Sequence, residues 1–408
     1  MIDIKLIMEN PEKIKKAVED KARVVDIDKI VSLDKEHRTQ INEIDRLRHQ
    51  QKQFGKDNIE EAKTNKSELK ALEKKSKIIE LELGKLLAQV PNPADNFVPI
   101  GDESKNKIIE TVGKIPKFNF KVNDHIKLGE KLNIIDVKRA SKVAGSRFVA
   151  LINDGAKLQM AIFQYVIDKI TSKGFDFVIP PHIINHQSMQ GMGYLEHGGE
   201  QETYHLEKDN MYLIGTSEQV LGPMRSNEIF SEKELPFRVC AFSPCYRREA
   251  GSYGKDTKGM FRVHQFHKVE MFSFCKPEDS KKEHEFFLSI EKEIYTELGI
   301  PFQVVLIATG DLGDPTSAKY DLEAWFAGQQ KYREITSTSN TTDFQARRLN
   351  IRYKTKAGKN ELVHMLNGTG ASDRPFIAIL ENNQNSDGSI TIPKVLVKYF
   401  GKDKIEVK

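Results

Sequence analysis

Two adjacent arginines and two glutamates lie within one short stretch, SPCYRREAGSYGKDTKGMFRVHQFHKVEMF. Arg247 and Arg248 end an apolar run, Glu249 follows directly, and Glu270 lies near the end of the stretch. Arginine is suited to two-point contacts with phosphate oxygens, and a carboxylate is suited to an ammonium group. A glycine-rich basic loop lies between the two groups. The pattern therefore predicts a hairpin that binds a ligand carrying both phosphate and amine.

The returning strand of this hairpin, predicted at Arg262–Phe274, adds an aromatic side chain. Side chains alternate between the faces of a strand, so one face is expected to carry Arg262, His264, Phe266, Lys268 and Glu270. That face would combine phosphate ligands, an aromatic platform for a base and a carboxylate. The alternative is a surface hairpin with scattered charges. His264 and His267 fall on opposite faces, which favours structural roles over a metal pair.

Two further segments contain residues that suit a nucleotide. In YREITSTSN, Glu334 and Ser337 offer a carboxylate and a hydroxyl, which suit Mg²⁺ because this ion prefers oxygen ligands and phosphates. In HMLNGTGASDRPFIAILEN, a predicted glycine-rich turn leads to Arg374, which could meet an outer phosphate, and then to a helix or strand. The sequence has neither a GxxxxGK[ST] loop nor a Rossmann glycine pattern, so neither common nucleotide-binding route is expected.

A charged N-terminal region, at about residues 30–90, is predicted to form an antiparallel coiled-coil hairpin. Steps of three and four join the seam positions of its second helix, which are Leu69, Leu72, Ser76, Ile79, Leu83, Leu86 and Val90. A looser seam in the first helix follows Ile30, Leu33, His37, Ile41, Ile44, Leu47, Gln51 and Phe54. The polar stretch FGKDNIEEAKTN joins the helices, and Pro91 and Pro93 end the second one.

Basic residues on this hairpin would suit a polyanion. They are Arg46, Arg48, Lys52 and Lys56 on the first helix and Lys70, Lys74 and Lys77 on the second. Acidic residues are interleaved with them, so a solvated charged helix pair or a dimerisation device is the alternative.

The rest of the chain is predicted to be an α+β domain with an antiparallel sheet flanked by helices, because consecutive strands are joined by hairpins. Helices are expected at Ala156–Lys173 and Glu278–Leu298. Strands are expected at Arg147–Ile152, Phe175–Ile179, Met211–Ile214, Phe237–Tyr246, Arg262–Phe274, Gln303–Ile307, Tyr332–Thr338 and Phe376–Leu380.

Length and composition limit the class of protein. The 408 residues suggest two or three domains, and a net charge of +4 does not by itself indicate nucleic-acid binding. The 3 cysteines favour a reducing compartment over a disulfide scaffold. Neither a signal-peptide pattern nor a stretch of transmembrane length is found, so we expect a cytoplasmic protein with no membrane partner.

Taken in order, the chemical segments resemble the signature motifs of class II aminoacyl-tRNA synthetases. GAKLQMAIFQYVIDKITSKGFDFVIPP is similar to motif 1, CYRREAGSYGKDTKGMFRVHQFHKVE to motif 2, and NGTGASDRPFIAILEN to motif 3. With them stand TSE at Thr216–Glu218, GDLG at Gly310–Gly313, SNTTDFQARR at Ser339–Arg348 and the N-terminal hairpin. Together these features resemble the seryl-tRNA synthetase (serine–tRNA ligase) family over essentially the whole chain.

The resemblance implies a role for each matching residue. The implied catalytic residues are Arg247, which bridges the ATP α-phosphate and the amino-acid carboxylate, and Arg374, on the γ-phosphate. The implied serine-binding residues are Thr216, Ser217, Glu218, Glu270 and Thr369. The implied ATP-binding residues are Arg247, Arg248, Glu249, Val263, Phe266, Glu334, Ile335, Thr336, Ser337 and Arg374. Mg²⁺ would be held by Glu334 and Ser337.

The implied reaction activates L-serine with ATP to seryl-adenylate and transfers it to the 3′ end of tRNA-Ser, releasing AMP and diphosphate. Whether tRNA-Sec is also charged stays open. The implied domains are a tRNA-binding domain at 1–96, whose coiled-coil arm contacts the long variable arm of tRNA-Ser, and a catalytic domain at 97–408. Motif 1 implies a homodimer.

Departures from the family pattern are few. SNTT stands where many members have SNCT, WFAGQQ where many have a proline-containing segment, Arg248 where Ser is frequent, and Thr369 where Ser is also common. Two rival functions are disfavoured. A homologue without catalysis would not be expected to keep Arg247, Glu270, Glu334 and Arg374. A ligase that charges a carrier protein would be expected to lack the hairpin.

Overall fold

The computed structural model describes residues 1–55, 57–250 and 259–407. The chain divides into two compact units, Met1–Pro93 and Ala94–Lys408. Two features named above lie outside the described residues, namely Lys56 and residues 251–258, which hold most of the glycine-rich basic loop. Among the described residues, no helix combines the length and apolar character needed to cross a bilayer.

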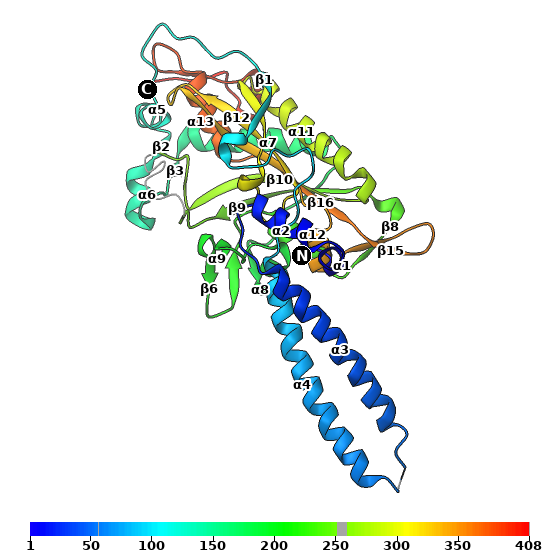
Figure 1. Ribbon diagram of the computed structural model, residues 1–408. Helices are drawn as coiled ribbons and strands as arrows, with labels where there is room; N and C mark the ends of the chain where they lie inside the picture. Colours follow the sequence, from blue (N-terminus) through cyan, green and yellow to red (C-terminus); the bar gives the residue numbers. More distant parts are fainter. Residues whose placement is uncertain (56, 251–258, 408) are drawn as a thin grey trace. The chain divides into compact units, whose positions relative to one another are not determined.

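The first unit contains the predicted helical hairpin. Two short helices, α1 (Ile4–Glu9) and α2 (Pro11–Asp20), precede the long helices α3 (Ile27–Gln51) and α4 (Ile59–Gln89), which run antiparallel (Figure 1). Ion pairs connect the two helices: Lys29 Nζ lies 2.5 Å from Glu82 Oε1, and Lys75 Nζ lies 3.0 Å from Glu36 Oε1. The polar connection is shorter than predicted, because α4 already begins at Ile59.

The seam between α3 and α4 differs from the prediction most clearly at Ile41. Ser76, Ile79 and Leu83 are buried as expected, but Ile41 is 42% exposed and Gln40 is buried in its place. The predicted seam at Ile41 was wrong because it needed two successive steps of four, whereas a 3.5-residue period continues from position 37 to position 40.

The second unit is built on an eight-stranded sheet, which confirms the predicted α+β class. Its order is β1 (Lys107–Val112), β11 (Phe302–Leu306), β12 (Ala318–Phe326), β13 (Lys331–Asn340), β16 (His364–Ala371), β10 (Gln265–Cys275), β9 (Phe237–Tyr246) and β4 (Asp176–Val178). All neighbours pair antiparallel except β4 and β9, which are parallel.

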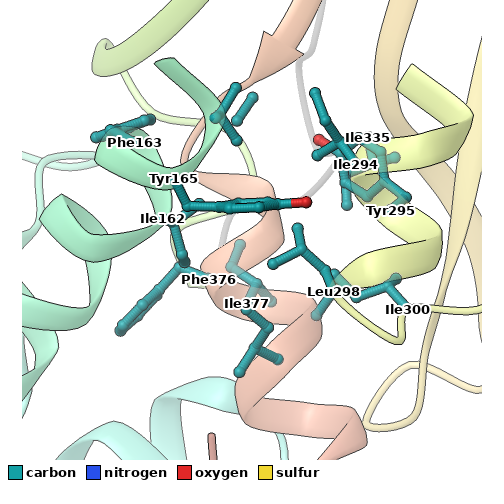
Figure 2. Packing of buried hydrophobic residues seen from close by; sticks show 14 of the residues in the cluster. Ile162, Phe163, Tyr165, Ile294, Tyr295, Leu298, Ile300, Ile335, Phe376 and Ile377 are labelled. Carbon is teal, nitrogen blue, oxygen red and sulfur yellow. The ribbon is translucent and has the colours of Figure 1, made fainter. Parts of the chain in front are cut away.

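Three helices pack against this sheet: α7 (Asn153–Thr171), α11 (Ser280–Glu297) and α13 (Arg374–Asn382). Figure 2 shows their side chains meeting in one apolar core, to which α7 contributes Ile162 and Tyr165, α11 Ile294, and α13 Phe376. The core residues of α7 recur at steps of three and four, as an amphipathic helix requires. Because one face of the sheet is packed against these helices, the sheet is a rigid support for the residues on its opposite face.

Two predictions about the chain near Arg374 were wrong. Phe376–Leu380 is part of helix α13 rather than a strand, since a short apolar run does not by itself distinguish a buried strand from a buried helix. The glycine-rich segment before it is not a turn but lies inside strand β16. A β-carbon at Gly370 would lie 2.6 Å from Ile170 Cδ1, so glycine is needed here for close packing of α7.

Smaller elements complete the second unit. Their strands are β2 (Ile135–Asp136) with β3 (Ala150–Leu151); β5 (Ile183–Asn185), β7 (Met211–Leu213) and β6 (Tyr204–Leu206); β8 (Ile229–Ser231), β14 (Arg352–Lys354) and β15 (Asn360–Leu362); and β17 (Ile390–Thr391) with β18 (Lys404–Ile405). Their α-helices are α5 (His125–Leu132), α6 (Val137–Ala144), α8 (His186–Met192), α9 (Gly199–Glu202), α10 (Glu218–Leu221), α12 (Phe344–Leu349) and α14 (Lys394–Phe400). The 3₁₀ turns are η1 (Glu103–Lys105), η2 (Pro223–Arg225), η3 (Glu232–Glu234), η4 (Pro277–Asp279) and η5 (Thr309–Asp311).

Candidate active site

An open cavity brings together residues from the segment after β9, from β10, β13 and β16, and from the start of α13. Ten residues proposed from the sequence line it, namely Arg247, Glu249, Val263, Phe266, Glu334, Ile335, Thr336, Ser337, Thr369 and Arg374. A second open cavity shares Arg247 and Glu249 and adds Thr216. The fold therefore gathers segments that are far apart in the sequence at one place.

Arg247 lies at the exit of β9, where the chain leaves the sheet. Its Cζ atom lies 5.2 Å from the centre of the Phe266 ring, and its Nε donates a 3.1 Å hydrogen bond to the carbonyl oxygen of Gly215. The register of β9 and β10 pairs Phe266 with Cys245, two residues before the arginine. These contacts hold one cationic side chain beside an aromatic ring at the cavity wall.

Arg374 stands across the cavity at the N-terminus of α13. Its Nη1 donates a 2.7 Å hydrogen bond to the carbonyl oxygen of Glu334 and lies 3.4 Å from Glu334 Oε1. Desolvation would raise the pKa of Glu334, but Arg374, Lys319 and Arg247 together lower that pKa to about 2. Glu334 is therefore anionic, and it lies on the same strand as Ser337.

The predicted alternation along the returning strand was wrong at its start. Strand β10 begins only at Gln265, so Arg262 and Val263 both line the cavity instead of facing opposite ways. Arg262 Nη1 donates a 3.1 Å hydrogen bond to Glu249 Oε2. The chain bends before the sheet begins, because the loop end is held by other contacts, including a 3.0 Å contact between the His264 ring and the Arg247 carbonyl oxygen.

Arg248 lines neither of the two cavities. Its Nε donates a 2.9 Å hydrogen bond to the carbonyl oxygen of Thr203, and its Cζ atom lies 4.9 Å from the Tyr204 ring centre. Ser217 is fully buried, with its hydroxyl 2.8 Å from the hydroxyl of Ser243. The ATP role of Arg248 and the serine role of Ser217 stay predictions.

Glu270 is 1% exposed and sits in a buried polar cluster. Thr369 Oγ1 donates a 3.2 Å hydrogen bond to Glu270 Oε2, and the two residues are direct partners across β10 and β16. Lys268 Nζ lies 2.6 Å from the same oxygen and donates a 2.8 Å hydrogen bond to Thr216 Oγ1. The cluster can therefore present a carboxylate and hydroxyl groups to a small polar ligand.

Lys268 and Tyr194 take part in this cluster, although no role was predicted for them from the sequence. The alternation of β10 places Lys268 on the face of Glu270, which was the available signal. Tyr194, whose hydroxyl donates to Glu218 Oε1, is remote in sequence, and no local pattern connects the two.

Glu218 is a second buried carboxylate, and it interacts electrostatically with Glu270. Burial and the negative charge of Glu270 raise the pKa of Glu218 to about 7, although Lys268 opposes the shift. Within the part of the chain that the structure describes, Glu218 Oε2 has no hydrogen-bond partner. A cationic group that reached this oxygen would meet an unsatisfied acceptor.

Comparison with known proteins agrees with this geometry. Residues 203–383 match the class II core domain of the tRNA synthetases for G, H, P, S and T, so fold and site define a class II aminoacyl-tRNA synthetase. Residues 1–94 match the seryl-tRNA synthetase N-terminal domain. The chain belongs to the seryl-tRNA synthetase family.

Individual relatives resemble the chain from end to end. A serine–tRNA ligase of Nitrosopumilus maritimus is 42% identical, covering 99% of this chain and 100% of the relative. The crystal structure of seryl-tRNA synthetase from Pyrococcus horikoshii complexed with ATP superposes with a TM-score of 0.94 at 38% identity, covering 100% of both chains. The serine–tRNA ligase of Naegleria fowleri in complex with AMP gives 0.90 at 33%, covering 100% of this chain and 99% of that one.

Proposed function

We propose that this chain is an ATP-dependent ligase that activates L-serine to seryl-adenylate and transfers the seryl group to the 3′ end of tRNA-Ser, releasing AMP and diphosphate. The observation that carries the proposal is that a candidate amino-acid site and a candidate nucleotide site lie next to each other. A buried polar cluster at Glu270 suits a small hydroxy amino acid. The adjoining cavity contains Arg247, Phe266 and Arg374, which suit a nucleoside triphosphate.

In the first step, an oxygen of the serine carboxylate attacks the α-phosphorus of ATP, and the bond to diphosphate breaks. We assign Arg247 to hold the serine carboxylate and the α-phosphate together, and Arg374 to hold the γ-phosphate. Phe266 offers its ring to adenine, beside Glu249. Catalysis by these residues consists of positioning the reactants and stabilising developing phosphate charge.

Serine recognition is assigned to the buried cluster. Glu218 accepts the ammonium group, with Thr216 beside it, and Glu270 with Thr369 accepts and donates to the side-chain hydroxyl. In the second step, a ribose hydroxyl of the terminal tRNA nucleotide attacks the seryl carbonyl carbon, and AMP leaves.

Mg²⁺ fits the oxygen donors of β13. Glu334 is anionic because of its cationic neighbours, and Ser337 lies on the same cavity wall, so these two residues would hold the ion. Mg²⁺ usually binds through one or two carboxylates together with substrate phosphates. When bound, the ion supplies neutralisation of phosphate charge.

The tRNA partner is assigned to the first domain, at 1–96. The exposed side chains of Lys70, Lys74 and Lys77 on α4 support contact with the long variable arm of tRNA-Ser, whereas Arg46 is 2.5 Å from Glu43 and Arg48 is 2.8 Å from Glu73. Charging of tRNA-Sec is a separate question, which a charging assay with both purified tRNAs would answer.

A homodimer in the cytoplasm completes the proposal. Exposed apolar side chains on α7 and around β4 support the homodimer, since Met160 is 57%, Phe177 41% and Ile179 71% exposed. Light scattering should give twice the chain mass, and fractionation of the source cell should place the protein in the cytosol. A single-chain mass at micromolar concentration would contradict the dimer.

The decisive assay is amino-acid-dependent exchange between pyrophosphate and ATP, run with each of the twenty amino acids. We expect exchange with serine above all others. Strong exchange with a different amino acid, or none with any, would refute the proposed substrate. Charging of tRNA-Ser with labelled serine then tests the second step.

A further inference from the structure

Two arginines lie over one phenylalanine ring at the edge of the active-site cavity. The Cζ atom of Arg333 lies 3.8 Å from the centre of the Phe261 ring, and that of Arg374 lies 4.7 Å from it. Phe261 lines the cavity and is only 7% exposed. Guanidinium groups this close to an aromatic ring are attracted by the negative potential of its face.

The ring is itself held firmly. Phe326 packs edge-on against Phe261 at 5.3 Å between ring centres. The preceding residue, Met260, donates its backbone N–H to His125 Nε2 at 3.2 Å. His125 Nδ1 in turn lies 2.7 Å from Glu381 Oε1, and both groups are buried.

This chain of contacts connects the ring to the helix that begins with Arg374. Glu381 lies in the last turn of α13, and Arg374 is the first residue of the same helix. Phe261 and the arginine are thus anchored to opposite ends of one element. The distance between ring and guanidinium is therefore set by the fold and not only by their mutual attraction.

A ring contact has a specific advantage for a phosphate ligand. A carboxylate partner occupies the N–H groups at the edge of a guanidinium, whereas an aromatic ring occupies its face and leaves those N–H groups available. Arg374 has both kinds of partner, since Glu334 lies at one edge of its guanidinium. When nucleotide phosphates take N–H groups of Arg374, the ring contact can persist.

We propose that Phe261 is a positioning residue for ATP, which holds the guanidinium of Arg374 in the orientation that meets the outer phosphates. The proposal rests on the assignment of this cavity to ATP. The alternative is that Phe261 only fills space between α13 and β12.

The test varies the ring at constant shape. Incorporation of singly to fully fluorinated phenylalanine at position 261 weakens the negative face stepwise while keeping the apolar volume. We expect the Kd for Mg²⁺–ATP, measured by calorimetry on the full-length protein, to rise with each step to about three- to tenfold in total, as for a partly buried cation–π contact. The Kd for AMP, which lacks the outer phosphates, should not change.

Two variants separate positioning from packing. Phe261→Leu should weaken ATP binding as strongly as the fully fluorinated residue, without changing the KM for serine in pyrophosphate exchange. Phe302→Leu is the matched control, because Phe302 is a fully buried ring of the same core that contacts neither Phe261 nor a guanidinium among the described contacts; ATP binding should be retained. When Arg374 is already replaced by alanine, Phe261→Leu should not raise the Kd for ATP any further.

The outcomes distinguish the two proposals. If wild-type protein binds ATP but exchanges pyrophosphate with an amino acid other than serine, the proposed function fails, and the ATP-to-AMP comparison still tests Phe261. If the Kd for ATP does not follow the fluorine series, or if ATP and AMP weaken equally, Phe261 is a packing residue and the inference is overturned.

Discussion

The buried glutamates of the serine cluster differ in their hydrogen-bond and ion-pair partners. Glu270 has the Lys268 ammonium at 2.6 Å, which compensates its charge directly. Glu218 has a neutral tyrosine hydroxyl as its hydrogen-bond partner, and its pKa is raised to about 7. Without substrate, Glu270 therefore has a cationic partner in direct contact, whereas Glu218 has a raised pKa, which the ammonium group of serine would lower.

The raised pKa of Glu218 predicts a pH-dependent stability. The folded protein favours the protonated form of Glu218, so protonation of this group stabilises the fold. The stabilisation is complete below the ordinary pKa of 4.5 and is lost as the pH rises through about 7. Glu218→Gln should therefore raise the free energy of unfolding at pH 8 by about 1–3 kcal/mol relative to wild type, and much less at pH 5. Denaturant unfolding of the unliganded proteins at both pH values measures this. An equal effect at the two pH values would contradict it.

Glu270→Gln tests the hydroxyl contact. The amide keeps the shape but removes the charge that faces Lys268 and Thr369, so serine activation should fall. The serine-over-alanine ratio should shrink too, because sites built to hydrogen-bond a hydroxyl can discriminate by roughly 10⁴–10⁵. Pyrophosphate exchange with serine, alanine and threonine measures both quantities. Wild-type kinetics with a wild-type ratio would remove Glu270 from the serine pocket.

At the scale of elements, strand β16 has to pass close beneath α7 while it carries Thr369 to the site. Gly370 makes this approach possible, since an added β-carbon would lie 2.6 Å from Ile170 Cδ1 and 2.9 Å from Val166 Cγ1. Both of these side chains are fully buried, so they have little room to move.

Gly370→Ala should therefore lower the free energy of unfolding of the catalytic unit by about 1–3 kcal/mol, as is usual for an overpacked core. It should also raise the KM for serine, because Thr369 is the adjacent residue. Gly313→Ala is the control, as its nearest neighbour would lie at 3.8 Å, an ordinary contact. If the two variants were equally stable, α7 would be able to shift and make room for the added methyl group, and the prediction would be wrong.

At the scale of the whole molecule, the candidate site residues all lie in the second unit. The two chemical steps should therefore be separable. Residues 37–74 can be replaced by a short glycine–serine turn, because Glu36 and Lys75 already face each other across the hairpin at 3.0 Å. Pyrophosphate exchange should survive this change, whereas charging of tRNA-Ser should be lost.

A charge variant controls for disruption of the first unit. Lys70→Glu, Lys74→Glu and Lys77→Glu together keep both helices but reverse the exposed charge of α4. This variant should weaken tRNA binding, with a smaller salt dependence than wild type, because fewer phosphates are neutralised. Loss of exchange in either folded variant would contradict the division of labour.

Much of the architecture follows from local patterns in the sequence. The heptad seam predicts the hairpin of α3 and α4, and strand β9 was predicted with its observed bounds, Phe237–Tyr246. Period-two alternation places Phe266, Lys268 and Glu270 on one face, because β10 pairs with β9 without a register shift from Gln265 to Phe274. Residue types at these positions were enough to predict phosphate and amine chemistry.

Other features were decided only by tertiary structure. Strand β12 was not predicted, because its lysine, aspartate and glutamate are poor strand formers and only its central place in the sheet stabilises it. Part of helix α13 was predicted as a strand, because a short apolar run does not distinguish a buried strand from a buried helix. The pairing of Tyr194 with Glu218, and of two arginines with Phe261, joins segments remote in sequence. Composition and spacing supply the chemical groups, but the charge of Glu218 and the orientation of Arg374 depend on neighbours that only folding brings close.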